Sequence, residues 1–221
     1  MLILAVDTSG KHGSIALAQC EEEQCCVLEV VSLIGGTFSA QLVPQIAALL
    51  SKHGFSKVEL QAFAVASGPG SFTGLRVGLA AIKGLAEILR KPIAAVSLLE
   101  ILAIKSGAQG KILALMDAGR HEVYAGEYEI APDGAHLHAE RLLSRAELLK
   151  RTPPVSAVTP DSTIAAELRE AGVPVVETEP VSGEDIAKLG WRKIRTGETV
   201  TPEDLEANYI RRSDAEIFSK S

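Results

Sequence analysis

The predicted strands and helices follow the same order twice along the 221-residue chain. In each half, three strands come first, and two further strands then alternate with three helices. Strands joined by short turns are expected to be antiparallel, whereas strands joined through a helix are expected to be parallel. Each half therefore predicts a mixed sheet covered by helices. The first half has predicted strands at 2–6, 14–19, 25–33, 61–66 and 92–96 and helices at 39–53, 71–90 and 98–105, and the second half has strands at 111–116, 121–130, 135–142, 155–158 and 173–176 and helices at 145–150, 162–171 and 183–195.

The repeated order predicts an α/β protein of two lobes, an N-terminal lobe at 1–107 and a C-terminal lobe at 108–221. Two such lobes side by side resemble the architecture shared by actin, sugar kinases and Hsp70, which is called the ASKHA fold. In active members of that class, the turn after the first strand of each lobe grips the phosphates of ATP. The resemblance concerns the fold, and nucleotide binding does not follow from it.

The turns at the matching positions contain Asp7, Thr8 and Ser9 in the first half and Asp117 in the second half. These four residues are the candidates for a vestigial nucleotide site, since carboxylate and hydroxyl oxygens suit a Mg²⁺-phosphate contact. The favoured alternative is a strand-end turn in which the aspartate caps local N–H groups.

Composition excludes several classes of protein. The formal net charge is −6, so the chain is expected to bind nucleic acid poorly by itself. No apolar run reaches the length of a membrane span, and the first residues lack the basic segment of a secretion signal. Cys20, Cys25 and Cys26 are an odd set without CxxC spacing, which favours a reducing cytoplasm.

The Gly-rich segment at 67–74 precedes a long apolar helix, as in phosphate-binding loops. The phosphate-loop pattern requires Lys followed by Ser or Thr after its last glycine. Here Leu75 and Arg76 follow Gly74, so a nucleotide loop is disfavoured. Ser71 and Thr73 are the candidates for the helix cap, and the helix N-terminus could still attract an anion.

The helix at 71–90 carries its charges in one arc of about 60°, and the rest of its circumference is apolar or glycine. Gly74, Gly78 and Ala81 share one face, and small residues let another helix approach closely. The helix at 39–53 also has a broad apolar stripe. Together they predict a partner-docking surface, although burial of both faces within the lobe is the open alternative. The predicted contact residues are Leu42, Val43, Ile46, Leu49, Leu50, Thr73, Gly74, Val77, Gly78, Ala81 and Leu85.

No catalytic or metal-binding residue is predicted. The five histidines contain no His-x-x-x-His pair, and His136 with His138 would need a third ligand to hold a metal. The segment from Gly70 to Gly74 does not match the G-x-S-x-G pattern of a serine hydrolase. Hydrolysis by this chain alone is therefore not expected.

Several motifs resemble those of the bacterial TsaB (YeaZ) family. They are ILAVDTS, SGPGSFTGLRVGLAAIKGLA, VSLLE, DAGRHEVYAGEY and NYIRR, which extend from the first strand to about residue 212. The resemblance implies a non-catalytic subunit needed for threonylcarbamoylation of adenosine 37 in tRNAs that read ANN codons. It also implies docking to the catalytic protein TsaD through the two helices above, recruitment of the ATPase TsaE, and a homodimer when TsaD is absent.

Under this reading, the chain requires no cofactor of its own, and ATP or ADP with Mg²⁺ would bind only at the interface of the complex. Contact with tRNA would be indirect, no membrane would be involved, and the protein would be cytoplasmic. The alternative is an ATPase or small-molecule kinase of the actin-like class that acts alone.

Overall fold

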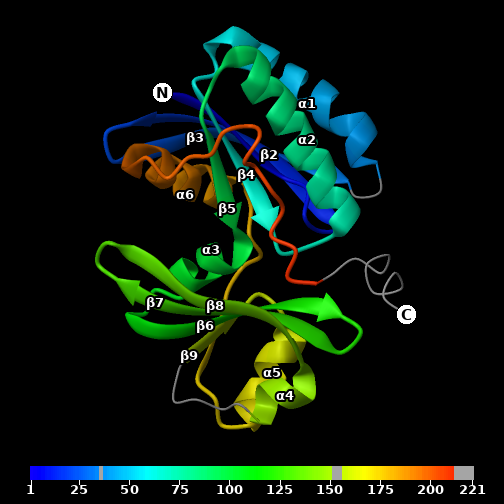
Figure 1. The fold of residues 1–221 in the computed structure, drawn as a ribbon, viewed down its shortest axis with the longest axis vertical. Helices are drawn as coiled ribbons and strands as arrows, with labels where there is room; N and C mark the ends of the chain where they lie inside the picture. Colours follow the sequence, from blue (N-terminus) through cyan, green and yellow to red (C-terminus); the bar gives the residue numbers. More distant parts are fainter. Residues whose placement is uncertain (35–36, 151–155, 212–221) are drawn as a thin grey trace. The chain divides into compact units, whose positions relative to one another are not determined.

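Two five-stranded sheets organise the structure, a computed structural model that describes residues 1–34, 37–150 and 156–211 (Figure 1). Both sheets contain parallel and antiparallel strands and are covered by helices, which confirms the predicted α/β, two-lobed class. Val155, the predicted first residue of one strand, and Arg212 of the NYIRR motif lie outside the described residues. No helix in the described ranges is long and apolar enough to cross a membrane.

The first sheet has the strand order β3-β2-β1-β4-β5. β1 is antiparallel to β2 and parallel to β4, so the hairpin-linked and helix-linked strands pair as predicted. All six residues of β1 are buried, as expected for a central strand covered on both faces. The strands are β1 (Leu2–Asp7), β2 (His12–Glu21), β3 (Gln24–Ile34), β4 (Ala62–Gly68) and β5 (Ile93–Ser97).

Two helices, α1 (Phe38–Lys52) and α2 (Phe72–Leu89), lie side by side over one face of the first sheet (Figure 1). The Ser71 Oγ accepts a hydrogen bond from the Gly74 N–H at 3.3 Å, which confirms Ser71 as the cap of α2. α1 begins one residue before Ser39, with Thr37 at its N-cap position. Buried leucine, isoleucine and phenylalanine side chains from both helices pack against the sheet in one core.

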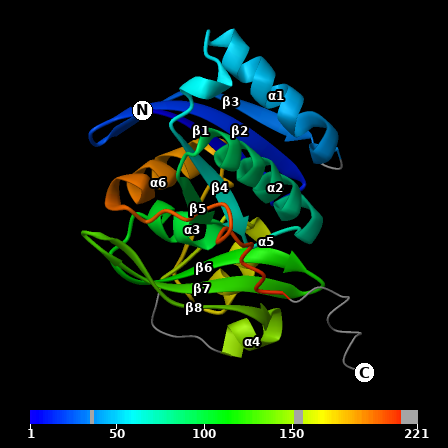
Figure 2. The ribbon, with the colours of Figure 1, turned by 45° about the horizontal axis from the view of Figure 1, so that its top comes forward.

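The opposite face of the first sheet is covered by α6 (Gly183–Thr196) (Figure 2). Two glycines allow its backbone to come close to the strands. A Cβ on Gly183 would lie 3.2 Å from that of Ala16, and a Cβ on Gly190 would overlap that of Ala64. The small residues on β2 and β4 therefore match the glycines on α6.

The second sheet repeats the topology of the first, with the order β10-β9-β6-β7-β8. β6 is antiparallel to β7 and parallel to β9. One face packs against α3 (Leu98–Lys105), and the other against α4 (Arg145–Lys150) and α5 (Ser162–Glu170). The strands are β6 (Gly110–Gly119), β7 (Glu122–Ala131), β8 (Gly134–Ser144), β9 (Ser156–Thr159) and β10 (Val175–Glu177).

The last helix of each half packs on the sheet of the other half. α3 follows β5 but contacts β6 and β7, whereas α6 follows β10 but contacts β1 and β2. The compact units are consequently Met1–Ser97 with Ser182–Asn208, and Leu98–Val181 with Tyr209–Ser221. This division does not coincide with the expected boundary between residues 107 and 108.

Cys20 and Cys25 face each other across the hairpin of β2 and β3, and a disulfide joins them. Cys26 is exposed and has a free thiol. The cytoplasmic location that the cysteine spacing favoured remains a prediction.

Candidate functional site

The Gly-rich segment packs against the turn that follows β1. The Ser71 N–H donates a hydrogen bond to the Ser9 carbonyl at 2.6 Å. A Cβ on Gly70 would lie 2.5 Å from that carbonyl oxygen, and a Cβ on Gly74 would overlap the Thr8 carbonyl oxygen. Glycine is thus required where the start of α2 approaches the backbone after β1. The segment closes over its own strand end and presents no open phosphate cradle.

Gly78 serves the same internal contact one turn further along α2. A Cβ there would overlap the Thr8 Oγ1 atom, which donates a hydrogen bond to the Gly74 carbonyl at 2.7 Å. Gly74 and Gly78 are both buried. The hypothesis that these glycines form a bare face for a partner helix is wrong, because the chain covers them with Thr8 of the turn after β1.

The structure separates the other predicted contact residues into covered and accessible ones. Val43 is 63 % exposed and Thr73 is exposed. Val77, Ala81 and Leu85 are half-buried. The side chains that belong to the core under α1, and so are unavailable for docking without rearrangement, are Leu42, Ile46, Leu49 and Leu50.

An accessible apolar surface remains on the sides of α1 and α2 that the sheet does not cover. Val43 belongs to it on α1, and Thr73, Ala80, Gly84 and Ile88 belong to it on α2. We call these five residues the outer face. Ile88 is 76 % exposed and was missed by the sequence analysis, although it lies four residues after Gly84 and therefore on the same side of the helix.

The turn after β1 is closed to solvent. Asp7, Thr8 and Ser9 are each less than 10 % exposed. The Ser9 N–H donates a hydrogen bond to Asp7 Oδ1 at 2.8 Å, as in the strand-end turn that the sequence analysis favoured. Burial raises the pKa of the Asp7 carboxyl, and the hydrogen bonds from Ser9 offset part of that effect.

Asp117 lies near the end of β6 in different surroundings. Its side chain is 44 % exposed and pairs with Arg145 at 3.2 Å. Arg145 also pairs with Glu167 of α5 at 2.7 Å. The carboxylate is thus held in an ion-pair network at the surface of the second unit.

The predicted histidine pair forms separate contacts. His136 lies 2.9 Å from Asp133, and His138 lies 3.8 Å from Glu129. Across the described ranges, no group of three or more His, Cys, Asp or Glu residues is arranged to hold a metal ion. The candidate site is the outer face of α1 and α2.

Known proteins with the same sequence pattern identify the family. A family model described as "TsaD: tRNA N6-adenosine threonylcarbamoyltransferase" matches residues 33–193. The chain is 31 % identical to the Bacillus subtilis protein named tRNA threonylcarbamoyladenosine biosynthesis protein TsaB, over 98 % of this chain and 96 % of that protein. The Escherichia coli protein of the same name is 30 % identical, with 97 % of this chain and 96 % of that protein covered.

A solved structure agrees with the sequence comparison. The structure of YeaZ from Pseudomonas aeruginosa superposes with a TM-score of 0.75 and 25 % sequence identity, covering 95 % of this chain and 100 % of that one. The predicted resemblance is confirmed: the chain belongs to the TsaB (YeaZ) family, and it also matches the family model for TsaD.

Proposed function

We propose that this protein is a non-catalytic subunit needed for N6-threonylcarbamoylation of adenosine 37 in tRNAs that read ANN codons. The observation that carries the proposal is its near-full-length identity to proteins named for threonylcarbamoyladenosine biosynthesis. The burial of Asp7, Thr8 and Ser9 in the turn after β1 agrees with a role other than nucleotide turnover. Because the proposed modification is made on tRNA, we place the protein in the cytoplasm.

The outer face of α1 and α2 is proposed as the docking surface for TsaD. Val43 and Ile88 are among the most exposed large apolar side chains in the described residues, and they lie on neighbouring helices. Burial of such side chains against a partner stabilises a complex in proportion to the apolar area removed from water. The same surface would form the homodimer when TsaD is absent, and TsaE would join the pair formed with TsaD.

Contact with tRNA is proposed to be indirect. The basic side chains near the C-terminal end of the described residues are paired with acids: Lys193 with Glu198, and Arg195 with Glu23. Pairing lowers the positive potential that phosphate binding requires, and the net charge of the chain is −6. ATP or ADP with Mg²⁺ is proposed to bind only in the assembled complex.

Complementation tests the function directly. A bacterial strain depleted of its own TsaB would receive this chain, and threonylcarbamoyladenosine would be measured in hydrolysed tRNA by mass spectrometry. Restored modification is expected. Unchanged depletion, with the chain expressed and soluble, would contradict the proposal.

Turnover by the isolated chain tests the alternative of an independent ATPase or kinase. Purified protein with ATP and Mg²⁺ is expected to release no phosphate above the background without protein. Clear turnover that survives repeated purification would overturn the non-catalytic assignment.

A further inference from the structure

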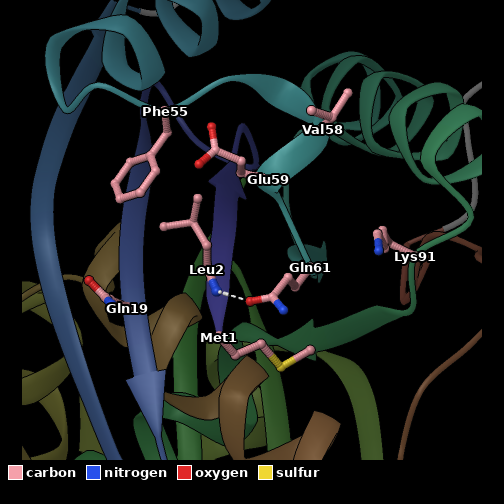
Figure 3. A pocket seen from close by; sticks show the side chains of 8 residues that line it. All are labelled: Met1, Leu2, Gln19, Phe55, Val58, Glu59, Gln61 and Lys91. Carbon is pink, nitrogen blue, oxygen red and sulfur yellow. Dashed lines mark hydrogen bonds between the residues drawn. The ribbon is translucent and has the colours of Figure 1, made fainter.

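A pocket of about 450 Å³ opens at the end of the first sheet where the central strands β1 and β4 begin (Figure 3). Asp7 ends β1 and therefore lies at the other end of that strand. The lining comes from the start of β1, Gln19 of β2, the segment at 55–61 with its 3₁₀ turn (Lys57–Glu59), and Lys91 after α2. The outer face and the turn after β1 contribute no residue to it.

One part of the lining is apolar. Leu2 is buried at the start of β1, and Phe55 is half-buried and packs against the core of the first unit. Val58 is 67 % exposed although it is a large apolar side chain. An apolar group bound in this pocket would cover part of Val58, which favours binding.

Glu59 and Lys91 carry opposite charges on the lining of the same pocket and do not pair with each other. The Met1 ammonium also lines the pocket and donates a hydrogen bond to the Cys20 carbonyl at 2.6 Å. The Glu59 Oε2 atom accepts hydrogen bonds from the Ser56 N–H at 2.8 Å and the Ser56 Oγ at 2.9 Å, which leaves Oε1 available. These bonds, led by the one from the backbone N–H, lower the pKa of Glu59 and keep it ionised at neutral pH. Lys91 is half-buried, and among the described residues no acid lies within ion-pair distance of it.

Gln61 adds an oriented hydrogen-bond donor. Its Oε1 atom accepts a hydrogen bond from the Leu2 N–H at 2.9 Å, which fixes the side-chain amide at the start of β4 (Figure 3). The Nε2 group keeps both protons for a ligand, since the described part of the chain provides no acceptor for it. A carboxylate is the ligand group that an amide N–H₂ and a lysine ammonium would both bind.

We propose that this pocket binds a small zwitterion with an apolar side chain, either a free α-amino acid or a dipeptide. The ligand carboxylate binds Lys91 and Gln61, and the ligand ammonium binds the free oxygen of Glu59. The apolar side chain lies against Phe55 and Val58. A ligand that carries both charges satisfies two pocket charges that do not satisfy each other.

Titrations monitored by NMR chemical shifts of the ¹⁵N-labelled chain test the proposal. The probes are L-leucine and the dipeptide leucyl-leucine, which distinguish the two ligand lengths. L-Leucinamide lacks the carboxylate, and N-acetyl-L-leucine lacks the ammonium. We expect at least one zwitterion to bind with millimolar affinity and to shift the amides of Leu2, Gln61 and Lys91. Each singly charged analogue should bind about tenfold more weakly.

Two variants remove the Lys91 and Glu59 charges of the pocket one at a time. Lys91→Gln should bind L-leucine and L-leucinamide equally, and Glu59→Gln should bind L-leucine and N-acetyl-L-leucine equally. Lys57→Gln is the matched control, because Lys57 is exposed on the same 3₁₀ turn but does not line the pocket. Since Glu59 also caps that turn, Lys91→Gln decides the outcome if Glu59→Gln alters the fold.

The proposal is overturned by any of three results. The first is no shift with either zwitterion up to about 50 mM. The second is that L-leucine binds to the unaltered chain and L-leucinamide binds equally well. The third is an unchanged preference for L-leucine over L-leucinamide in Lys91→Gln. None of these results bears on tRNA modification, which is measured separately.

Discussion

Asp7 at the end of β1 and Asp117 near the end of β6 occupy matching positions in two sheets of the same topology, yet the two carboxylates have different environments. Asp7 is buried and accepts a hydrogen bond from the Ser9 N–H. Asp117 remains 44 % exposed and is paired with Arg145. The repeated topology sets where each carboxylate lies along the chain, but the packing of the following segment sets its chemistry.

The backbone around each turn explains the difference. After β1, Gly70 and Gly74 let the α2 segment approach the main chain of Thr8 and Ser9. After β6, the hairpin turns at Arg120 and His121, which both have positive φ, and nothing lies within 4 Å of a Cβ built on Gly119. Glycine serves close approach in the first unit and backbone conformation in the second.

The largest expected effect is at Gly74. Gly74→Ala should destabilise the fold by about 3 kcal/mol or prevent folding, because the new Cβ overlaps the Thr8 carbonyl oxygen, a backbone atom with little freedom to move. Chemical denaturation monitored by circular dichroism measures the change. Gly84→Ala on the same helix is the matched control and should stabilise by about 0.5–1 kcal/mol, since nothing lies within 4 Å of its Cβ.

Gly78→Leu is expected to behave like Gly74→Ala. If Gly78 lay on a bare docking face, as the sequence analysis predicted, this variant would remain folded and lose only its partner contact. The overlap with Thr8 Oγ1 predicts instead a loss of stability of about 3 kcal/mol. A thermal midpoint equal to that of the unaltered chain would contradict the internal role of the glycine.

Asp7→Asn should stabilise the protein at neutral pH by an amount of the order of 1 kcal/mol, because it keeps an oxygen for the Ser9 N–H and removes a buried charge. Burial raises the folded-state pKa of Asp7 above its unfolded value, so its contribution is most favourable below the unfolded pKa and is lost as the pH rises through the folded pKa. The advantage of Asp7→Asn should therefore shrink as the pH falls towards 4. Thermal unfolding across a pH series measures this trend, and a pH-independent difference would argue that Asp7 is solvated.

Gly119→Ala should cost about 1 kcal/mol, less than Gly74→Ala. The cost arises from φ of +69° and not from overlap, since the Cβ would meet open space. Gly119→Asn is the control and should cost less, because asparagine tolerates the left-handed region better than alanine does. Equal losses for both variants, measured by denaturant unfolding, would contradict the backbone explanation.

The smallest effect is expected at Asp117. Asp117→Asn should cost about 0.5 kcal/mol or less, because its pair with Arg145 is partly screened by solvent. The loss should fall as salt is raised. A double-mutant cycle with Arg145→Lys would measure the coupling, and a coupling above about 2 kcal/mol would place Asp117 in a more buried network than its exposure indicates.

The order of strands and helices could be predicted from the sequence because alternation, apolar runs and turn residues are local signals. The packing of α3 and α6, each on the sheet of the other half of the chain, could not be predicted. α3 is apolar on most sides, with only Glu100 and Lys105 charged, so its pattern does not indicate which of the two sheets it packs against. For α6, the signal lies in Gly183 and Gly190, whose partners Ala16 and Ala64 are distant in sequence.

The candidate site was predicted only in part for a related reason. A glycine pair at helical spacing allows a close approach, but the spacing does not say whether the neighbour is the chain's own strand or a partner. The identification of α1 and α2 as docking helices remains a prediction, now assigned to the outer face. Val43 and Thr73 were among the predicted contacts, whereas Ala80, Gly84 and Ile88 were not.

The most direct measurement of this account is light scattering of the chain mixed with TsaD, using an arginine on the outer face. Ala80→Arg places a charge on the exposed side of α2, and Ala166→Arg makes the same change on the exposed side of α5. We expect the unaltered chain and Ala166→Arg to form a complex with the summed mass of both proteins, whereas Ala80→Arg, with an unchanged circular dichroism spectrum, should elute separately from TsaD. Complex formation by Ala80→Arg equal to that of Ala166→Arg would contradict docking through the outer face.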